Sequence, residues 1–400
     1  MTRNILIMAG GTGGHIFPAL AVADCLRRQG WHITWLGAPN SMEAELVPKH
    51  GYEMAWVRFS GLRGKGLLRK LLLPLNLLVA LWQSAVAMLR HRPDVVLGMG
   101  GYITFPGGIM AALLRRPLVI HEQNSIAGLS NKTLAHFAKR VLSGFPKVLP
   151  GAEWCGNPVR DSIAALPEPQ QRYAARNSVL NVLVVGGSLG AKAINECVPQ
   201  ALALLREGEG EATEHPPAYP SRVLPQAVRP NGQARFPHPC PLPEGEGDKD
   251  SLREGLFNVT HQTGKQHFEA VQTAYQQSGV AAEIKPFLED MAHYYAWADV
   301  VICRAGALTI AELAAAGVAS ILVPFPFAVD DHQTGNARFL SERGAAILLP
   351  QGELTPKRLA DLLQDMTRAH ALAMAQAARA AAQPAAASRV AQVCAELVAA

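Results

Sequence analysis

Residues 5–15 read ILIMAGGTGGH, an apolar run that leads directly into a glycine-rich loop. Residues 182–191 read VLVVGGSLGA and repeat that arrangement in the second half of the chain. Apolar residues at helical spacing follow each loop. A strand, a glycine turn and a helix together point free backbone N–H groups and a positive helix end at an anion. We therefore predict an α/β protein with two lobes and a cleft between them.

Short apolar, β-branched runs alternate with amphipathic segments along the chain. This alternation is typical of parallel sheets that helices cover on both faces. A weak internal echo favours two similar lobes, because Asp94 and Asp299 each precede a four-residue apolar run. The predicted strands are residues 4–8, 32–36, 94–98, 117–121, 181–185, 257–261, 298–303 and 319–324.

The composition fits a large enzyme of a reducing compartment. A chain of 400 residues with 49% hydrophobic content can bury a sizeable core in two or three domains. The six cysteines are scattered without disulfide or zinc spacing, so we expect reduced thiols. The chain enters its first strand without a basic region and a long apolar core, so no secretory signal is expected.

A basic, leucine-rich stretch contains no acidic residue between Glu53 and Asp94. Pro74 and Asn76 interrupt its apolar run, which we expect to be too short to span a bilayer. Cations beside leucines suit a surface that lies on an anionic membrane, and a core helix with a solvated basic end is the alternative. Nucleic acid is disfavoured because few aromatic residues lie among the cations. The expected membrane residues are Arg63, Lys65, Leu67, Leu68, Arg69, Lys70, Leu72 and Trp82.

One segment, residues 207–254, differs from its surroundings. It holds nine prolines and two Glu-Gly repeats, and it has few apolar residues to bury. Such composition predicts a disordered surface insertion. Asp248 and Asp250 match the D-x-D metal motif of some sugar transferases, but without a flanking strand we expect no metal there. The boundary between the two lobes is expected between residues 156 and 169.

A dinucleotide-binding fold is the default interpretation of such loops. Its fingerprint needs G-x-G-x-x-G and an acidic residue at the end of the second strand. Here Ile16 replaces the last glycine, and the second strand ends in Leu36-Gly37-Ala38 without an acid. The chain also lacks the G-x-x-x-x-G-K-[ST] motif. An NAD enzyme and a P-loop ATPase are therefore disfavoured.

Six motifs, spread over nearly the whole chain, instead resemble those of the MurG family of peptidoglycan glycosyltransferases, in the same order. One such motif alone would be weak support, and the set is specific. The motifs are GGTGGHIFP (10–18), GMGGY (98–102), HEQN (121–124), GNPVR (156–160), GGSLGA (186–191) and RAGALTIAE (304–312).

The resemblance implies a GT-B fold with two Rossmann-like lobes. Residues 1–161 would form the lobe that takes lipid I, undecaprenyl-pyrophosphoryl-MurNAc-pentapeptide, at the cytoplasmic face of the inner membrane. Residues 162–385 would bind UDP-N-acetylglucosamine (UDP-GlcNAc), and residues 386–400 would return to the first lobe. The implied reaction transfers GlcNAc to the 4-hydroxyl of MurNAc with inversion and yields lipid II. No metal or other cofactor is expected.

The reaction needs a base for the acceptor hydroxyl and positive potential on the departing pyrophosphate. His15 is the candidate base, because an imidazole accepts a proton near neutral pH, and Glu122 is its rival. Tyr102 and His121 would line the acceptor site. The residues that match donor-binding positions of the family are Thr12, Gly13, Gly14, Asn124, Arg160, Ser188, Leu288, Ala307, Leu308, Thr309, Ile310, Ala311, Glu312 and Gln333.

Several of these residues have a second interpretation. Ser188 could be a helix N-cap as well as a nucleotide ligand. Glu312 matches the family's ribose ligand, but with Thr309 it also forms the pattern of a capping box. Leu288 would contact uracil through its backbone. Gln333 follows a loop that departs from the family pattern.

Three other functions fit part of the pattern. One is a different GT-B lipid glycosyltransferase, such as a diacylglycerol glycosyltransferase. Another is a UDP-sugar 2-epimerase, which would not need the acid-free basic stretch. The third is a non-catalytic protein that binds a nucleotide sugar or a lipid, and His15, Asn124 and Glu122 argue against it.

Overall fold

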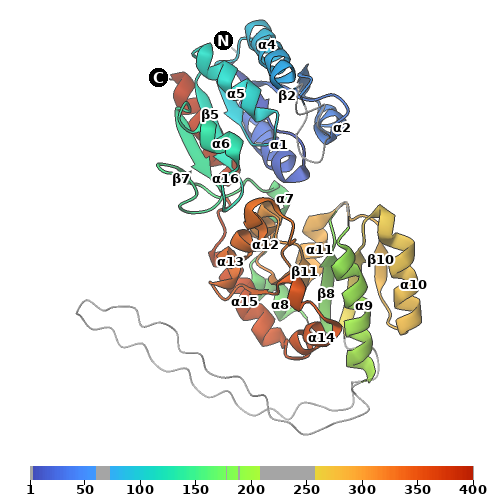
Figure 1. The fold of residues 1–400 in the computed structure, drawn as a ribbon. Coiled ribbons are helices and arrows are strands. Elements are labelled where there is room, and N and C mark those ends of the chain that lie inside the picture. Colours follow the sequence, from blue (N-terminus) through green and yellow to red (C-terminus); the bar gives the residue numbers. More distant parts are fainter. Residues whose placement is uncertain (1–2, 60–72, 177, 188–189, 208–256, 400) are drawn as a thin grey trace, which may run out of the picture.

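The computed structural model describes residues 3–59, 73–176, 178–187, 190–207 and 257–399. It has two lobes, each built on a parallel sheet with helices on both faces (Figure 1). The predictions for residues 60–72, Ser188 and most of 207–254 lie outside the described residues. They include the membrane residues Arg63, Lys65, Leu67, Leu68, Arg69, Lys70 and Leu72.

The first lobe contains a seven-stranded sheet in the order β3-β2-β1-β4-β5-β6-β7. Its strands are β1 (Asn4–Met8), β2 (His32–Gly37), β3 (Glu53–Trp56), β4 (Val95–Gly98), β5 (Leu118–Glu122), β6 (Arg140–Ser143) and β7 (Glu153–Trp154). The helices between them are α1 (Gly13–Arg28), α2 (Met42–Lys49), α4 (Leu73–His91), α5 (Thr104–Leu113) and α6 (Leu129–Leu134).

The second lobe contains a six-stranded sheet in the order β10-β9-β8-β11-β12-β13. Its strands are β8 (Leu180–Val185), β9 (Phe257–Gln262), β10 (Glu283–Lys285), β11 (Val300–Cys303), β12 (Ala319–Leu322) and β13 (Ala346–Leu348). Its helices are α8 (Pro169–Ala174), α9 (Lys192–Glu207), α10 (Phe268–Ser278), α11 (Met291–Trp297), α12 (Ala307–Ala316), α13 (His332–Ser341), α14 (Pro356–Gln364) and α15 (Arg368–Ala380).

The two sheets use the same device to align their central strands. The Asp94 carboxylate accepts a hydrogen bond from the backbone N–H of Asn4 at 2.8 Å. The Asp299 carboxylate accepts one from the backbone N–H of Asn181, also at 2.8 Å. In both lobes an aspartate before the fourth strand therefore accepts from a backbone N–H at the start of the first strand. The similarity between the sequences around Asp94 and Asp299 therefore has a structural cause.

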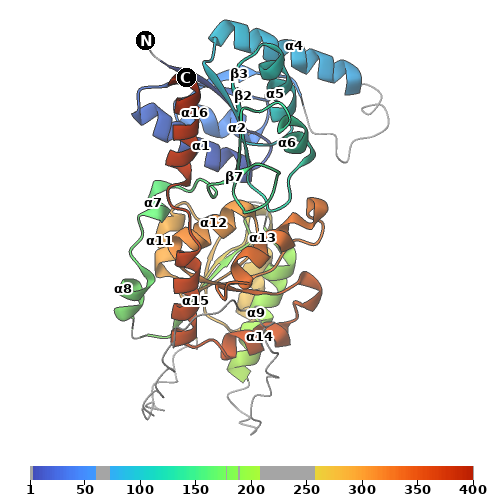
Figure 2. The same cartoon turned by 90° about the vertical axis from the view of Figure 1, so that its left-hand side faces the viewer.

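Two chain segments connect the lobes. The first follows β7 and leads into the short helix α7 (Asp161–Ala164), and the second lies between α15 and α16 (Ala386–Ala399). Helix α16 packs against α1, and Val390, Ala391, Val393 and Cys394 join the core of the first lobe (Figure 2). The C-terminus therefore lies with the N-terminal lobe.

Helix α4 covers one face of the first sheet and is longer than we expected. Within the described residues it is the one helix whose length and composition would allow it to cross a membrane. Pro74 and Asn76 do not interrupt it, because residues 73–91 form a single helix of 19 residues. Ala80, Ala87 and Met88 nevertheless belong to the core of the lobe, whereas Leu78 and Trp82 are exposed. This one-sided burial is that of a helix in the outer layer of the lobe.

Candidate active site at the lobe boundary

The glycine loop after β1 is held by a buried carboxylate. Gly11 has a φ of +90° and donates its backbone N–H to Glu43 at 3.1 Å. The Glu43 side chain is wholly buried and also accepts from the N–H of Ala38. Thr12 is the N-cap of α1 with an extended backbone and no side-chain capping bond. The loop therefore leads Gly13, Gly14 and His15 into the first turn of α1. The backbone N–H of His15 donates to the Thr12 carbonyl oxygen at 3.1 Å, and the N–H groups of Gly13 and Gly14 precede the first helical hydrogen bond and can meet a ligand.

His15 lies beside the turn that follows β4. Its Nδ1 is 3.0 Å from Oε1 of Gln123, a side chain that is almost completely buried. A Cβ atom at Gly100 would lie 2.6 Å from that ring nitrogen, and a Cβ at Gly101 would lie 2.2 Å from the Gly10 carbonyl oxygen. The GMGGY motif is thus needed because its backbone packs directly on His15 and on the first glycine loop. Tyr102 packs on this loop as well, and burial raises the pKa of its phenol.

We expected His121 to line the acceptor site, but the structure places it elsewhere. It is wholly buried, and its two ring nitrogens face the carbonyl oxygen of Gly156 at 2.9 Å and the Gln123 amide at 3.2 Å. Burial lowers the pKa of the imidazole to about 4, so the ring is neutral near pH 7. His121 therefore lies behind Gln123 in the interior of the lobe.

Glu122, the rival base, uses both carboxylate oxygens to hold a loop. Oε1 accepts from the backbone N–H of Asn124 at 2.9 Å, and Oε2 accepts from the Asn131 amide at 2.8 Å and from the N–H of Gly128. The side chain is almost completely buried. This geometry favours a structural role and leaves His15 as the candidate base.

The loop braced by Glu122 contacts the second lobe through Asn336 of α13. The Asn336 amide oxygen accepts from the backbone N–H of Ser125 at 2.9 Å, and its nitrogen donates to the carbonyl oxygen of Ala305. The same nitrogen lies 3.4 Å from the Asn124 side-chain oxygen. Asn124 is thereby placed at the boundary, next to the segment that enters α12. Nothing in the local sequence singled out Asn336.

Glu312 lies in the second turn of α12, where Arg160 and Tyr295 meet its carboxylate. Arg160 donates to Oε1 at 2.9 Å, and the Tyr295 hydroxyl donates to Oε2 at 3.2 Å. Burial raises the pKa of Glu312, and the Arg160 guanidinium opposes that rise. The capping-box interpretation was wrong, because the N-cap of α12 is Gly306 and Glu312 lies six residues beyond it.

The remaining donor candidates surround the start of α12. Its first residues, Ala307, Leu308 and Thr309, carry backbone N–H groups without helical partners. Leu288 is buried in the core of the lobe. Gln333 accepts from the backbone N–H of Phe325 at 2.9 Å. Ile310 and Ala311 follow in the same helix.

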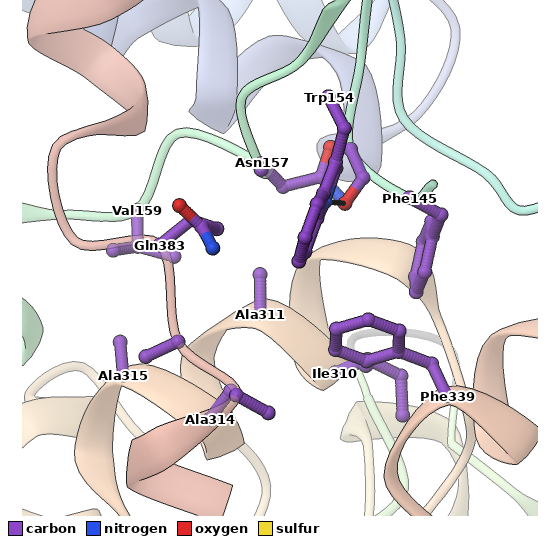
Figure 3. A pocket seen from close by; sticks show the side chains of 14 residues that line it. Phe145, Trp154, Asn157, Val159, Ile310, Ala311, Ala314, Ala315, Phe339 and Gln383 are labelled. Carbon is purple, nitrogen blue, oxygen red and sulfur yellow. Dashed lines mark hydrogen bonds between the residues drawn. The ribbon is translucent and has the colours of Figure 1, made fainter. Parts of the chain in front are cut away.

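A small crevice of about 20 Å³ lies where the first connecting segment meets α12 (Figure 3). Phe145 and Trp154 come from the first lobe and surround Phe339 of the second, with ring centroids 5.2 Å and 6.2 Å from it. Asn157 donates its amide to the carbonyl oxygens of Gln123 and Ala307, one in each lobe. The crevice is therefore a packed joint between the lobes.

Within the described ranges, no group of three or more His, Cys, Asp or Glu side chains could hold a metal ion. Asp248 and Asp250 of the D-x-D motif lie outside these ranges. In the described site, the N-termini of α1 and α12 offer positive potential to an anion.

Comparison with known proteins supports the resemblance. Residues 5–143 match the N-terminal domain of glycosyltransferase family 28, and residues 181–393 match its C-terminal domain. The chain is 54% identical over 397 residues to a protein of Dechloromonas aromatica, and 55% identical to one of Aromatoleum aromaticum. Both are named UDP-N-acetylglucosamine–N-acetylmuramyl-(pentapeptide) pyrophosphoryl-undecaprenol N-acetylglucosamine transferase, and the matches cover 99% of this chain and 98–99% of theirs.

A solved structure agrees with these relatives. The crystal structure of Acinetobacter baumannii MurG is 37% identical to this chain, with a TM-score of 0.76 over 98% of this chain and 99% of that one. The chain belongs to the MurG family. Like that MurG, it has the GT-B fold. CalG4, the calicheamicin glycosyltransferase, shares this fold with a TM-score of 0.59 at only 15% identity.

Proposed function

We propose that this protein transfers GlcNAc from UDP-GlcNAc to the 4-hydroxyl of MurNAc in lipid I, with inversion at the anomeric carbon, to give lipid II. The observation that carries the proposal is the 54% identity to transferases named for this reaction, over nearly the full length of both chains. The placement of His15 and Glu312 on either side of the lobe boundary supports it. The first lobe then contributes the base for the acceptor hydroxyl, and the second contributes the carboxylate that binds the donor.

The chemistry is a single in-line displacement. The acceptor 4-oxygen forms a bond to the anomeric carbon as the bond from that carbon to the pyrophosphate oxygen breaks, and UDP departs with the electron pair. His15 takes the proton of the attacking hydroxyl. The negative charge that grows on the pyrophosphate is stabilised by the N-terminus of α12, whose backbone N–H groups are fixed before the reaction.

The donor is held by residues of both lobes. Glu312 accepts hydrogen bonds from the ribose hydroxyls, and Arg160 and Tyr295 fix the orientation of its carboxylate. Asn124 contacts the sugar from the first lobe, Leu288 contacts uracil through its backbone, and Gln333 contacts the nucleotide. Thr12, Gly13, Gly14, Ser188 and residues 307–311 complete the donor site, and Tyr102 contacts the acceptor.

The first lobe associates with the cytoplasmic face of the inner membrane as a peripheral protein. Leu75, Leu78, Trp82 and Leu89 present an exposed apolar face on α4, each at least 59% exposed. The basic, acid-free stretch immediately precedes and includes this helix. Apolar side chains beside cations bind a surface of anionic lipid, and lipid I is itself anchored there. No nucleic-acid partner is proposed.

A transfer assay tests the function directly. Purified full-length protein is incubated with a lipid I analogue and radiolabelled UDP-GlcNAc, and UDP-galactose serves as the competing donor. We expect lipid-linked product from UDP-GlcNAc and far less from UDP-galactose. Product on diacylglycerol but not on the lipid I analogue would replace the proposal with the other lipid glycosyltransferase. Conversion of UDP-GlcNAc without any acceptor would indicate an epimerase.

A further inference from the structure

A run of hydrogen bonds leads from the first connecting segment to the imidazole of His15. The carbonyl oxygen of Gly156 lies 2.9 Å from Nε2 of His121. Nδ1 of that ring lies 3.2 Å from the side-chain nitrogen of Gln123. Oε1 of Gln123 then lies 3.0 Å from Nδ1 of His15. A carbonyl oxygen only accepts hydrogen bonds, so the direction of each bond follows from the Gly156 end.

The protons along this run have one consistent arrangement. Nε2 of His121 carries a proton, because it faces the Gly156 carbonyl oxygen. The buried ring is neutral, with its pKa lowered to about 4, so its Nδ1 accepts. Gln123 therefore turns its NH₂ group to His121, where it also lies 3.3 Å from the His121 carbonyl oxygen, another pure acceptor. Its Oε1 is left for His15, whose Nδ1 must donate.

We propose that Gln123 is a positioning residue that holds neutral His15 in the Nδ1–H tautomer and thereby makes Nε2 the atom that accepts the proton of the acceptor hydroxyl. The inference rests on the proposed function, in which His15 is the base. A neutral imidazole has one bare nitrogen, and the bond made by the other nitrogen decides which one it is. A ring without this partner divides its population between two tautomers, of which one has no base at Nε2.

The backbone around this run leaves it no room to change. A Cβ at Gly100, where φ is +92°, would lie 2.6 Å from Nδ1 of His15 and 3.0 Å from Oε1 of Gln123. A Cβ at Gly156, where φ is +85°, would lie 2.3 Å from the side chain of Gln383. Asn157 donates to the Gln123 carbonyl oxygen at 2.9 Å and holds its main chain. Glycines at both ends therefore allow the hydrogen bonds that set the tautomer.

The tautomer is read directly from ¹⁵N chemical shifts of the full-length protein labelled at histidine, with the His15 signals assigned by their loss in His15→Asn. We expect a protonated Nδ1 and a bare Nε2 in the unmodified protein. In Gln123→Met the population moves toward Nε2–H, and kcat falls about 10- to 100-fold while KM for UDP-GlcNAc changes less than about twofold. Gln123→Glu keeps an oxygen for the Nδ1 proton, so it retains the tautomer and recovers part of kcat.

Thr104→Val is the matched control for a merely structural effect. The Thr104 hydroxyl is buried in the same turn and donates to the Gly100 carbonyl oxygen at 2.8 Å. We expect this variant to lose stability and to keep the His15 tautomer. A protonated Nε2 on His15 in the unmodified protein, or an unchanged tautomer in Gln123→Met, would overturn the inference. Both measurements of the His15 tautomer, in the unmodified protein and in Gln123→Met, are made without substrate. Their outcome can therefore be told apart from a failure of the proposed transfer reaction.

Discussion

At the scale of single residues, the site is defined by side chains whose environments differ sharply. His15 lies at the free end of a hydrogen-bond run, whereas Glu122 has both oxygens bound and His121 is enclosed. A group that moves a proton needs reach to the substrate as well as basicity. Of the two candidate bases, His15 and Glu122, the geometry supports His15.

Replacement of His15 by alanine is expected to lower kcat by about 10²- to 10⁴-fold, which is the usual contribution of a general base. KM for UDP-GlcNAc should change little, because the imidazole acts on the acceptor side. Steady-state transfer to a lipid I analogue measures both constants, and His370→Ala on the distant helix α15 serves as the control. Turnover of His15→Ala within about threefold of the unmodified protein would remove His15 as the base.

Buried neutral histidines also make stability depend on pH. His261, enclosed with Asn195 and Tyr275, has its pKa lowered by burial to about 3. The unfolded chain binds this proton near pH 6.5 and the folded chain does not, so the free energy of unfolding falls as pH falls below about 6.5. Between pH 6.5 and 4, protonation of His261 in the unfolded chain lowers the free energy of unfolding by about 3 kcal/mol.

Urea unfolding at a series of pH values measures that loss. His261→Gln, which retains hydrogen-bonding atoms without a titrating ring, should show a shallower decline over this pH range than the unmodified protein. Equal declines in the two proteins would show that His261 does not supply the dependence, and exposed His50→Gln controls for the removal of any histidine.

At the scale of elements, each lobe depends on the aspartate that joins its first and fourth strands. Asp299 is completely buried and meets Arg176, Arg368 and the backbone N–H of Asn181. Asp94 is only half-buried and meets the N–H of Asn4. At the same position in the fold, the aspartate of the second lobe therefore balances two arginine charges, whereas that of the first lobe accepts a backbone hydrogen bond.

Asp299→Ala is expected to destabilise the second lobe by about 3 kcal/mol, because two arginines lose their buried counter-charge. Asp94→Ala, its matched partner, should cost about 1 kcal/mol, the usual value of one hydrogen bond. Urea unfolding followed by circular dichroism compares the two variants. Equal losses would contradict the role that we assign to the arginines.

Much of the element pattern could be predicted from the chain. The run at residues 4–8 is β1, and that at 181–185 lies within β8. Continuous apolar, β-branched segments beside glycine turns are typical of buried strands in parallel sheets. The strands β3, β6, β7, β10 and β13 were missed. They have two to four residues each and lie at a sheet edge or next to one, so their conformation depends on pairing with a neighbour more than on local pattern.

At the scale of the whole molecule, the two lobes meet through a few polar contacts and an aromatic joint. Ser125 and Asn336 are 211 residues apart in the chain and bond at 2.9 Å. Helix α16 returns to the first lobe, so both connecting segments lie between the lobes. The outer face of the first lobe carries α4, whose exposed leucines and Trp82 are far in sequence from the donor site.

The double variant Leu78→Gln/Trp82→Gln should bind vesicles of phosphatidylglycerol about tenfold more weakly, because two apolar side chains no longer enter the lipid surface. Cosedimentation with the vesicles measures the binding. Leu204→Gln, an exposed leucine on α9 of the second lobe, is the control and should bind as the unmodified protein does. Undiminished binding of the double variant would contradict the membrane role of α4.

The chain by itself determined the central strands of both sheets, its two glycine loops, its six family motifs and hence its fold and reaction, because these depend on short-range patterns. Tertiary structure alone decided which motif residues meet. It placed Gln123 between His15 and His121. It paired Glu312 with Arg160, where the sequence had allowed a helix cap. It also brought Asn336 within hydrogen-bond distance of Ser125. These pairs are separated by up to 211 residues, and no local pattern encodes a contact that only the packing of two sheets brings about.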